Sequence, residues 1–318
     1  MSHASFASAA DDREQIARLV ELAPAVYGFV SDHDPNCGFV VGEHGVLVID
    51  TRATPRLGRE LITAIQSVTY KPVRQIFLTH YHAVRVLGTA AFEPRPTLIA
   101  SSGTRQWIEE RGQADYDSEF GRFPRLFQDH HEIPGLTRPD LVFDDELTVA
   151  MGGFDVQLMH IGRGHSRGDS VAWLPQQRVL FAGDLVENRC AVYAGDGYLR
   201  EWSQTLSKLE ALAPRVLLPG RGAPLLSPAD ALGAIAATRG FLDAVWRSVE
   251  QGRARGLNRR GIYETTLAAM APLYGEWPVF QHVLPFDVCR AIEEQEAGGE
   301  PSIWTEARDR ALWAELHG

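Results

Sequence analysis

Two histidines separated by one residue, His80 and His82, follow the short apolar run Ile76–Leu78. In an extended chain, residues two apart point to the same side. Both imidazoles can therefore converge on one point just past the end of a buried strand. Two neutral imidazoles at this spacing are the beginning of a transition-metal site, and the remaining ligands have to come from elsewhere in the chain.

Two later segments offer such ligands. His165 lies between glycines in the segment Gly162–Asp169, and the glycines let the backbone turn sharply and present the imidazole. Asp184 follows the apolar segment Val179–Ala182 after Gly183, and a carboxylate at the end of a buried strand is costly unless it is paired or bound to a metal. The candidate metal shell has three nitrogens and one oxygen, from His80, His82, His165 and Asp184.

The composition excludes several classes of protein. The chain has 318 residues, 45% of them hydrophobic and 23% charged, which is typical of a globular protein with a sizeable core. The formal net charge of −10 disfavours nucleic acid as a partner. The three cysteines form no Cys-x-x-Cys pair, so neither a thiolate zinc site nor a disulfide framework is indicated. We expect no signal peptide and no membrane span, and therefore a cytoplasmic protein.

The apolar pattern predicts strand-rich and mixed segments followed by helices alone. Strands are expected at 26–30, 38–41, 46–49, 73–78, 97–100, 141–143, 147–150, 154–160, 170–174, 179–182 and 216–218. Helices are expected at 12–22, 55–68, 103–110, 199–212, 228–249, 260–271, 288–296 and 305–316. Residues 113–138, rich in charge and aromatic rings, are expected to form an irregular loop over a cleft.

This order predicts an α+β fold with two layers of sheet flanked by helices. We expect an N-terminal lead with a short helix at 1–25, a main domain at 26–224 and a helical extension packed on it at 225–318. Such an extension could cover a cleft or form a homodimer.

Five sequence blocks resemble, in the same order, those of the metallo-β-lactamase superfamily. They are Asn36-Cys37-Gly38 with the later Asp50-Thr51, Thr79-His80-Tyr81-His82, Gly164–Asp169, Val179–Asp184 and Leu217–Gly222. The resemblance implies a four-layer αβ/βα sandwich with a metal cleft at one edge of its two sheets. Members of the family are mostly zinc hydrolases, and some are iron enzymes. The helices after residue 225 lie outside the resemblance.

The chain departs from the family pattern at three positions. The first family motif is H-x-H-x-D-H, but Val84 stands in place of the aspartate and Arg85 in place of the third histidine. Arg221 replaces the histidine of the late Pro-Gly-His-Gly block. The resemblance implies that these are the second-metal ligands. It also implies that the first-metal ligands and the bridging carboxylate are retained, namely His80, His82, His165 and Asp184. We expect one divalent metal ion, zinc in the first place and iron as the alternative.

The substituted positions suggest catalytic and binding roles. Arg85 and Arg221 could replace the second cation and clamp an anionic substrate, or they could merely neutralise Asp184. Asp184 is the best substitute for the missing aspartate, either as fourth ligand or as general base. Asp50 resembles the family's aspartate behind the metal histidines, which fixes an imidazole tautomer. His282, inside an apolar run, could reach the cleft and replace a lost ligand.

The leading hypothesis is a mononuclear metal-dependent hydrolase of an ester-, lactone-, thioester- or amide-type bond in a small anionic molecule. The metal would polarise the carbonyl and supply hydroxide. The second hypothesis is an iron dioxygenase resembling the family's persulfide dioxygenases, with His80, His165 and Asp184 as its iron ligands. The third is a non-catalytic binding protein on a decayed enzyme scaffold.

Overall fold

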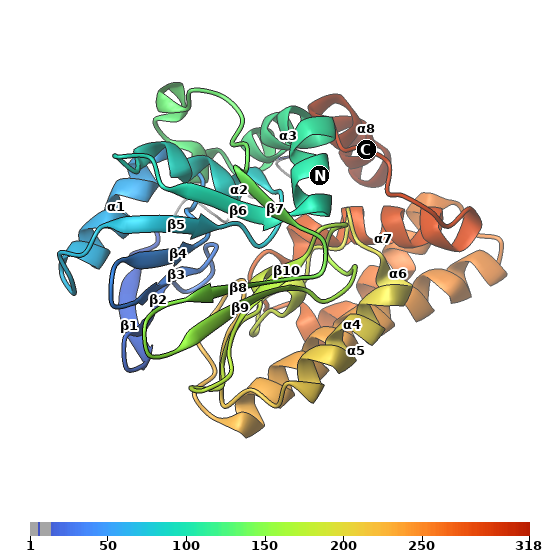
Figure 1. Cartoon of the computed structure of the whole chain (residues 1–318). Coiled ribbons are helices and arrows are strands. Elements are labelled where there is room, and N and C mark those ends of the chain that lie inside the picture. Colours follow the sequence, from blue (N-terminus) through green and yellow to red (C-terminus); the bar gives the residue numbers. More distant parts are fainter. Residues whose placement is uncertain (1–5, 7–13) are drawn as a thin grey trace.

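The computed structural model describes residue 6 and residues 14–318. Two β-sheets pack face to face, and helices cover their outer sides (Figure 1). The first sheet has the order β1-β2-β3-β4-β5-β6-β7. Its strands are β1 (Arg18–Ala23), β2 (Val26–Val30), β3 (Cys37–Val41), β4 (Val46–Ile49), β5 (Val73–Phe77), β6 (Thr97–Ser101) and β7 (Leu141–Phe143). Strands β1 to β4 pair antiparallel, and β4 to β7 pair parallel.

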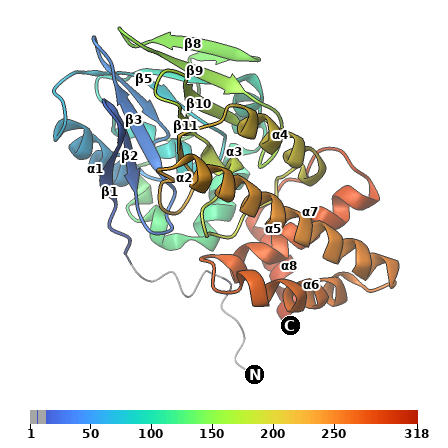
Figure 2. The ribbon, with the colours of Figure 1, turned by 90° about the horizontal axis from the view of Figure 1, so that it is seen from below.

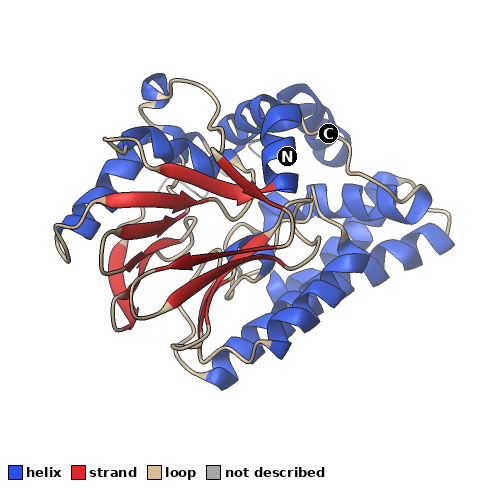
Figure 3. Ribbon diagram, in the orientation of Figure 1, coloured by secondary structure: helices blue, strands red, loops and turns tan. Residues whose placement is uncertain are grey.

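The second sheet has the order β12-β11-β10-β9-β8. Its strands are β8 (Glu146–Ala150), β9 (Asp155–His160), β10 (Ser170–Leu174), β11 (Val179–Phe181) and β12 (Val216–Leu218). Only the β11–β12 pair among them is parallel. Strands β11 and β12 run parallel, and the loops that follow β5, β11 and β12 meet, since Arg85 contacts Asp184 and Gly220. Figure 3 shows the two sheets in red with helices in blue around them.

The core lies in layers that follow the alternation of side chains along each strand. Leu47 and Ile49 of β4 belong to the cluster between the sheets, which also contains Leu158 and Phe181 of the second sheet. Val48 of β4 points to the other side, into the cluster under the helices of the first sheet. A strand buried on both faces in this way is typical of a sheet between two layers.

The helices of the first sheet are α1 (Pro55–Gln66), α2 (Ala83–Val86) and α3 (Ser102–Arg122), with short 3-10 segments at Leu87–Ala91, Pro124–Phe127 and His130–Glu132. Helix α4 (Leu199–Ala211) covers the second sheet, and the 3-10 turn Gly183–Leu185 follows β11. The C-terminal part consists of α5 (Pro228–Ala254), α6 (Arg259–Tyr274), α7 (Phe280–Glu296) and α8 (Glu306–His317).

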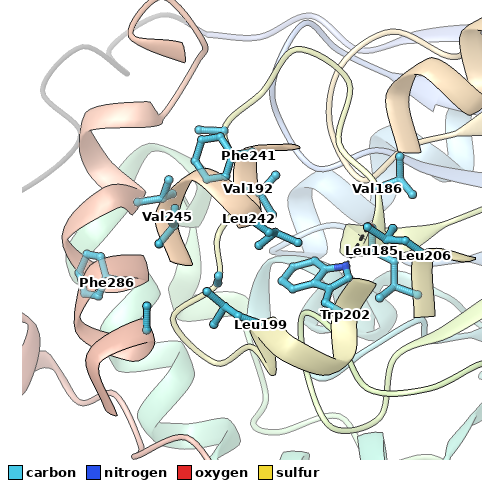
Figure 4. Close-up of a cluster of buried hydrophobic side chains, with 14 of the residues drawn as sticks. Leu185, Val186, Val192, Leu199, Trp202, Leu206, Phe241, Leu242, Val245 and Phe286 are labelled. Atoms are coloured by element: carbon cyan, nitrogen blue, oxygen red, sulfur yellow. Dashed lines mark hydrogen bonds between the residues drawn. The ribbon is translucent and has the colours of Figure 1, made fainter. Parts of the chain in front are cut away.

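The C-terminal helices pack on the rest of the molecule through a large apolar cluster. Figure 2 shows α5 to α8 gathered on one side of the two sheets. Trp202 of α4 lies beside Leu242 of α5 in this cluster, and Phe286 of α7 belongs to its far side (Figure 4). The indole Nε1 of Trp202 donates a hydrogen bond to the Leu185 carbonyl at 3.1 Å. Helix α8 packs on α3, so the extension contacts both halves of the sandwich. None of the described helices combines the length and apolar character that crossing a bilayer requires.

The fold corrects three of the expected elements. The helix expected at 12–22 is wrong over its described part, because Arg18–Ala23 forms an edge strand paired with β2. Residues 12 and 13 lie outside the described residues. The loop expected at 113–138 is wrong over its first third, because α3 continues to Arg122. The last correction concerns α7, which begins at Phe280 rather than at 288 and includes His282.

Candidate metal centre

The loops at the common edge of the sheets bring the four expected ligands together. His80 and His82 follow β5, His165 lies in the turn between β9 and β10, and Asp184 follows β11. One ligand atom from each of the four residues lies within 4.8 Å of all the others, and all four side chains are buried. The structure therefore supports the expectation that these residues, far apart in the sequence, share one site.

The ligand atoms suit a single divalent ion. His80 Nε2 and His165 Nε2 each lie 3.7 Å from Asp184 Oδ2, and His82 Nδ1 lies 2.9 Å from His165 Nε2. His80 Nε2 is buried and has no hydrogen-bond partner among the described residues. Three imidazole nitrogens and one carboxylate oxygen around one point are a donor set for zinc or iron. The residues present therefore fit one metal ion.

Hydrogen bonds fix the tautomers of two ligands. Asp50 accepts from the Thr79 amide at 2.9 Å and from the Thr79 hydroxyl at 2.7 Å. Because the Thr79 proton goes to Asp50, its oxygen accepts from His80 Nδ1–H at 3.0 Å, which leaves a lone pair on Nε2. His165 Nδ1 lies 2.9 Å from the Tyr193 carbonyl, which can only accept. Asp50 thus acts on His80 through Thr79 and touches no ligand ring itself.

The ionisation of the site favours metal binding at His80 and His165. Burial is the main cause that lowers the pKa of His80 far below its usual value, and it lowers the pKa of His165 to about 4. Both rings are therefore neutral at pH 7, as ligands must be. Burial would raise the pKa of Asp184, but Arg85, followed by His80 and His165, holds it well below its usual value. Asp184 is thus ionised throughout the neutral range.

His82 is held by two carboxylates that sequence reasoning missed. Its Nε2 lies 3.3 Å from Asp196 Oδ2 and 3.7 Å from Asp115 Oδ1. Burial would lower the pKa of His82, but Asp115 and Asp196 outweigh it and raise this pKa to about 9. Two residues of α3 also hold the loop after β5: Asp115 accepts from the Ala83 amide at 2.7 Å, and Glu119 from the Val84 amide at 2.9 Å.

Arg85 takes an internal position beside Asp184. Its guanidinium is 1% exposed, pairs with Asp184 Oδ1, and donates to the carbonyls of Asn36 and Gly220, the latter at 2.8 Å. A Cβ at Gly220 would lie 2.2 Å from Asp184 Oδ1 and 3.0 Å from Arg85 Nη2, so only glycine fits there. This geometry supports the alternative in which Arg85 neutralises Asp184.

A small cavity of about 20 Å³ adjoins the ligands. Its charged wall consists of Arg221 after β12, Glu187 after β11, and Glu119 and Arg122 of α3. Its apolar wall includes Val84, Phe123, Val279 and Val283. Arg85 is not among the described residues that line it. The loop expected at 113–138 hides the α3 residues, although the charges at 111, 115, 119 and 122 follow a helical period that could have revealed them.

His282 does not belong to the group that could hold a metal within the described chain. Its ring packs on Phe123, with the ring centroids 4.3 Å apart. The expectation that His282 replaces a lost ligand is therefore not supported by its position.

The fold and the site together define a metal-binding αβ/βα sandwich. Residues 30–221 match the model of the metallo-beta-lactamase superfamily, and the chain belongs to this superfamily. Its relatives in the superfamily are mostly hydrolases.

Individual relatives are distant. The chain is 24% identical over 217 residues to a metallo-beta-lactamase type 2 of Bacteroides fragilis, covering 64% of this chain and 78% of that protein. It is 22% identical over 215 residues to a linear primary-alkylsulfatase of Pseudomonas sp. (strain ATCC 19151), covering 57% of this chain and 40% of that protein.

Solved structures show the same fold. A metallo-beta-lactamase from Pontibacter korlensis matches with a TM-score of 0.56 and 21% identity over 72% of this chain and 99% of that chain. A double mutant of the sec-alkyl sulfatase PisA1 matches with a TM-score of 0.64 and 17% identity over 90% of this chain and 51% of that chain. The likeness to the sulfatase thus includes a C-terminal helical extension.

Proposed function

We propose that this protein is a mononuclear metal-dependent hydrolase of an ester-, lactone-, thioester- or amide-type bond in a small anionic molecule. The observation that carries the proposal is the four-residue donor set, in which Asp184 is shared with a guanidinium instead of a second ion. Membership in a superfamily whose members are mostly hydrolases supports the reaction class. The matches to sulfatases support including sulfate esters among the candidate substrates.

The ligands of the proposed ion are His80, His82, His165 and Asp184. A zinc ion held in this way would polarise a carbonyl and lower the pKa of a bound water to about 7. His80 and His165 contribute neutral nitrogens, and the ionised Asp184 contributes an oxygen. Because Arg85 keeps the pKa of Asp184 low, Asp184 acts as a ligand rather than as a general base.

A carboxylate other than Asp184 can transfer the proton between the water and the leaving group. Glu119 lines the cavity together with His82 and His165, and burial raises its pKa. A carboxyl group with a raised pKa can accept a proton from water and return it to a leaving group near neutral pH. Its hydrogen bond from the Val84 amide fixes it beside the position that carries the aspartate in the family motif.

Metal analysis of protein purified without added metal tests the proposal. We expect about one zinc ion per chain, lost in His165→Ala and kept in His44→Ala, a matched variant of an exposed histidine. The zinc protein is then screened with carboxylic esters, lactones, thioesters, sulfate esters and β-lactams.

Three outcomes contradict the proposal. Two metal ions per chain would contradict the mononuclear site. One iron per chain, with oxygen consumed in the presence of a persulfide, would favour the dioxygenase hypothesis. A folded protein that retains no metal would favour the non-catalytic hypothesis.

A further inference from the structure

Two arginines from distant parts of the chain face the cavity beside the metal centre. Arg122 ends α3, and Arg221 follows β12. Both line the cavity together with His82, His165 and Asp184. Arg221 donates one hydrogen bond from Nη1 to the His33 carbonyl at 3.1 Å.

Arg122 is held in place, but its guanidinium makes few hydrogen bonds. It is 2% exposed, and its buried Nε has no hydrogen-bond partner among the described residues. Its ion-pair partner Asp309 lies at 3.9 Å, too far for a hydrogen bond. The rings of Phe286 and Tyr193, at 4.7 and 5.0 Å from its guanidinium carbon, fix its orientation. A buried guanidinium with so few acceptors is costly unless a ligand completes its hydrogen bonds.

Among the described residues, the carboxylates that line the cavity make no close ion pair with Arg122 or Arg221. Asp184 is already paired with Arg85. Glu119 and Glu187 line the cavity and act on the arginines at longer range, Glu119 on both of them and Glu187 on Arg221. Burial raises the pKa of Glu119, and it raises that of Glu187 well above the usual value.

Glu187 gives an independent sign of a missing polar partner. Its carboxyl group is 4% exposed, and its buried Oε2 has no hydrogen-bond partner in the described part of the chain. A protonated carboxyl at this place can donate a hydrogen bond into the cavity, as an oxyanion requires.

We propose that Arg122 and Arg221 form an oxyanion subsite that takes the sulfate, sulfonate or carboxylate group of the substrate. The subsite rests on the proposed function and specifies its anionic substrate. Guanidiniums suit this task because their forked donors match planar and tetrahedral oxyanions. Arg122 thus replaces Arg85 in the anion clamp expected from the sequence, because Nη1 and Nη2 of Arg85 donate to groups inside the protein.

The remaining walls define the rest of the ligand. Val84, Phe123, Val279 and Val283 offer an apolar surface opposite the charges. The substrate class is therefore a small molecule with one oxyanion group and a short apolar body. The cavity of about 20 Å³ has room for about one water molecule, so its lining side chains must rearrange when a ligand enters.

Calorimetric titration of the metal-containing protein with inorganic sulfate tests the subsite, at constant ionic strength with chloride as the replaced ion. We expect Arg122→Met and Arg221→Met each to weaken sulfate binding about tenfold or more, the loss of charge-assisted hydrogen bonds. The matched control is Arg105→Met, which removes the same charge from an exposed position of α3 and should change the affinity less than about twofold.

Several results would overturn the subsite. One is wild-type affinity in both cavity variants, and another is an equal loss in Arg105→Met. A third is binding that disappears with the metal but is unchanged in the two variants, since the anion would then sit on the metal alone. Should the buried Arg122→Met fail to fold, Arg122→Lys and the less buried Arg221→Met decide the question.

The subsite and the hydrolase can fail separately. Sulfate binding through the two arginines, without hydrolysis of any ester in the screen, would keep the subsite and refute the hydrolase. Hydrolysis that proceeds equally in wild type, Arg122→Met and Arg221→Met, with no sulfate binding, would keep the hydrolase and refute the subsite.

Discussion

Replacement of Arg85 by methionine tests whether this guanidinium stabilises the fold by neutralising Asp184. Arg85 is 1% exposed and Asp184 6% exposed, so the pair is shielded from water. Removal of one partner of a buried ion pair costs about 3–5 kcal/mol. The carbonyls of Asn36 and Gly220 also lose a donor, at about 1–3 kcal/mol each where water cannot replace it. Because these costs overlap, we expect the free energy of unfolding of the metal-free protein to fall by about 4–6 kcal/mol.

The loss should depend on pH in a defined direction. The pKa of Asp184 is depressed in the folded wild-type protein, so its stabilisation is complete above the unfolded pKa of about 4 and is lost as the pH falls below it. Without Arg85, burial dominates, and a raised pKa destabilises the fold at neutral pH. The difference between wild type and Arg85→Met should therefore be largest near pH 7 and shrink towards acid.

Urea unfolding after removal of metal with a chelator gives the measurement. The control is Arg95→Met, which breaks an exposed pair with Asp140 at 2.9 Å and should cost at most about 1 kcal/mol. A cost below about 1 kcal/mol for Arg85→Met, or one that does not change with pH, would refute this account of Arg85.

Three further predictions concern the same centre. Binding of zinc at pH 7 should release about one proton, because His82 has a pKa of about 9 and must lose its proton to bind; calorimetry in buffers of different ionisation enthalpy measures this. The triple variant Val84→Asp, Arg85→His, Arg221→His should raise the metal content from about one to two ions per chain, since it restores the family motif. Val279→Gly should relieve the strain of φ 59° at a cavity wall, worth about 1–3 kcal/mol, and lower KM for longer esters relative to short ones.

The four expected ligands were predictable because each lies at the end of a strand with a strong local pattern. An apolar run that stops at a polar residue places that residue at the edge of a sheet, whichever sheet it is. His80, His165 and Asp184 were found in this way, without knowledge of which strands are neighbours.

The parts of the site on α3 were not predictable by the same rule. The buried face of the second half of this helix is polar, with Arg111, Asp115, Glu119 and Arg122 at helical spacing, so a search for apolar periodicity ends the helix at residue 110. The burial of Asp115 and Glu119 is explained only by the three-dimensional structure, in which they accept hydrogen bonds from the amides of the loop after β5 and Asp115 lies beside His82. The expected helix at 12–22 failed for the opposite reason, because Leu19 and Val20 suited a helix but pair with β2.

The substitutions at the second-metal positions change the chemistry of the site more than its charge. In the family pattern, a divalent ion with one aspartate and two neutral histidines carries a net charge of about +1, whereas Val84, Arg85 and Arg221 carry about +2. Attraction of an anion is therefore retained, while a second Lewis acid that could bind water is lost. Each arginine replaces one function of the second metal ion. Arg85 neutralises Asp184 inside the protein, and Arg221 places a positive charge in the cavity wall. Variants of Arg85 should thus act first on stability, and variants of Arg221 first on anion binding.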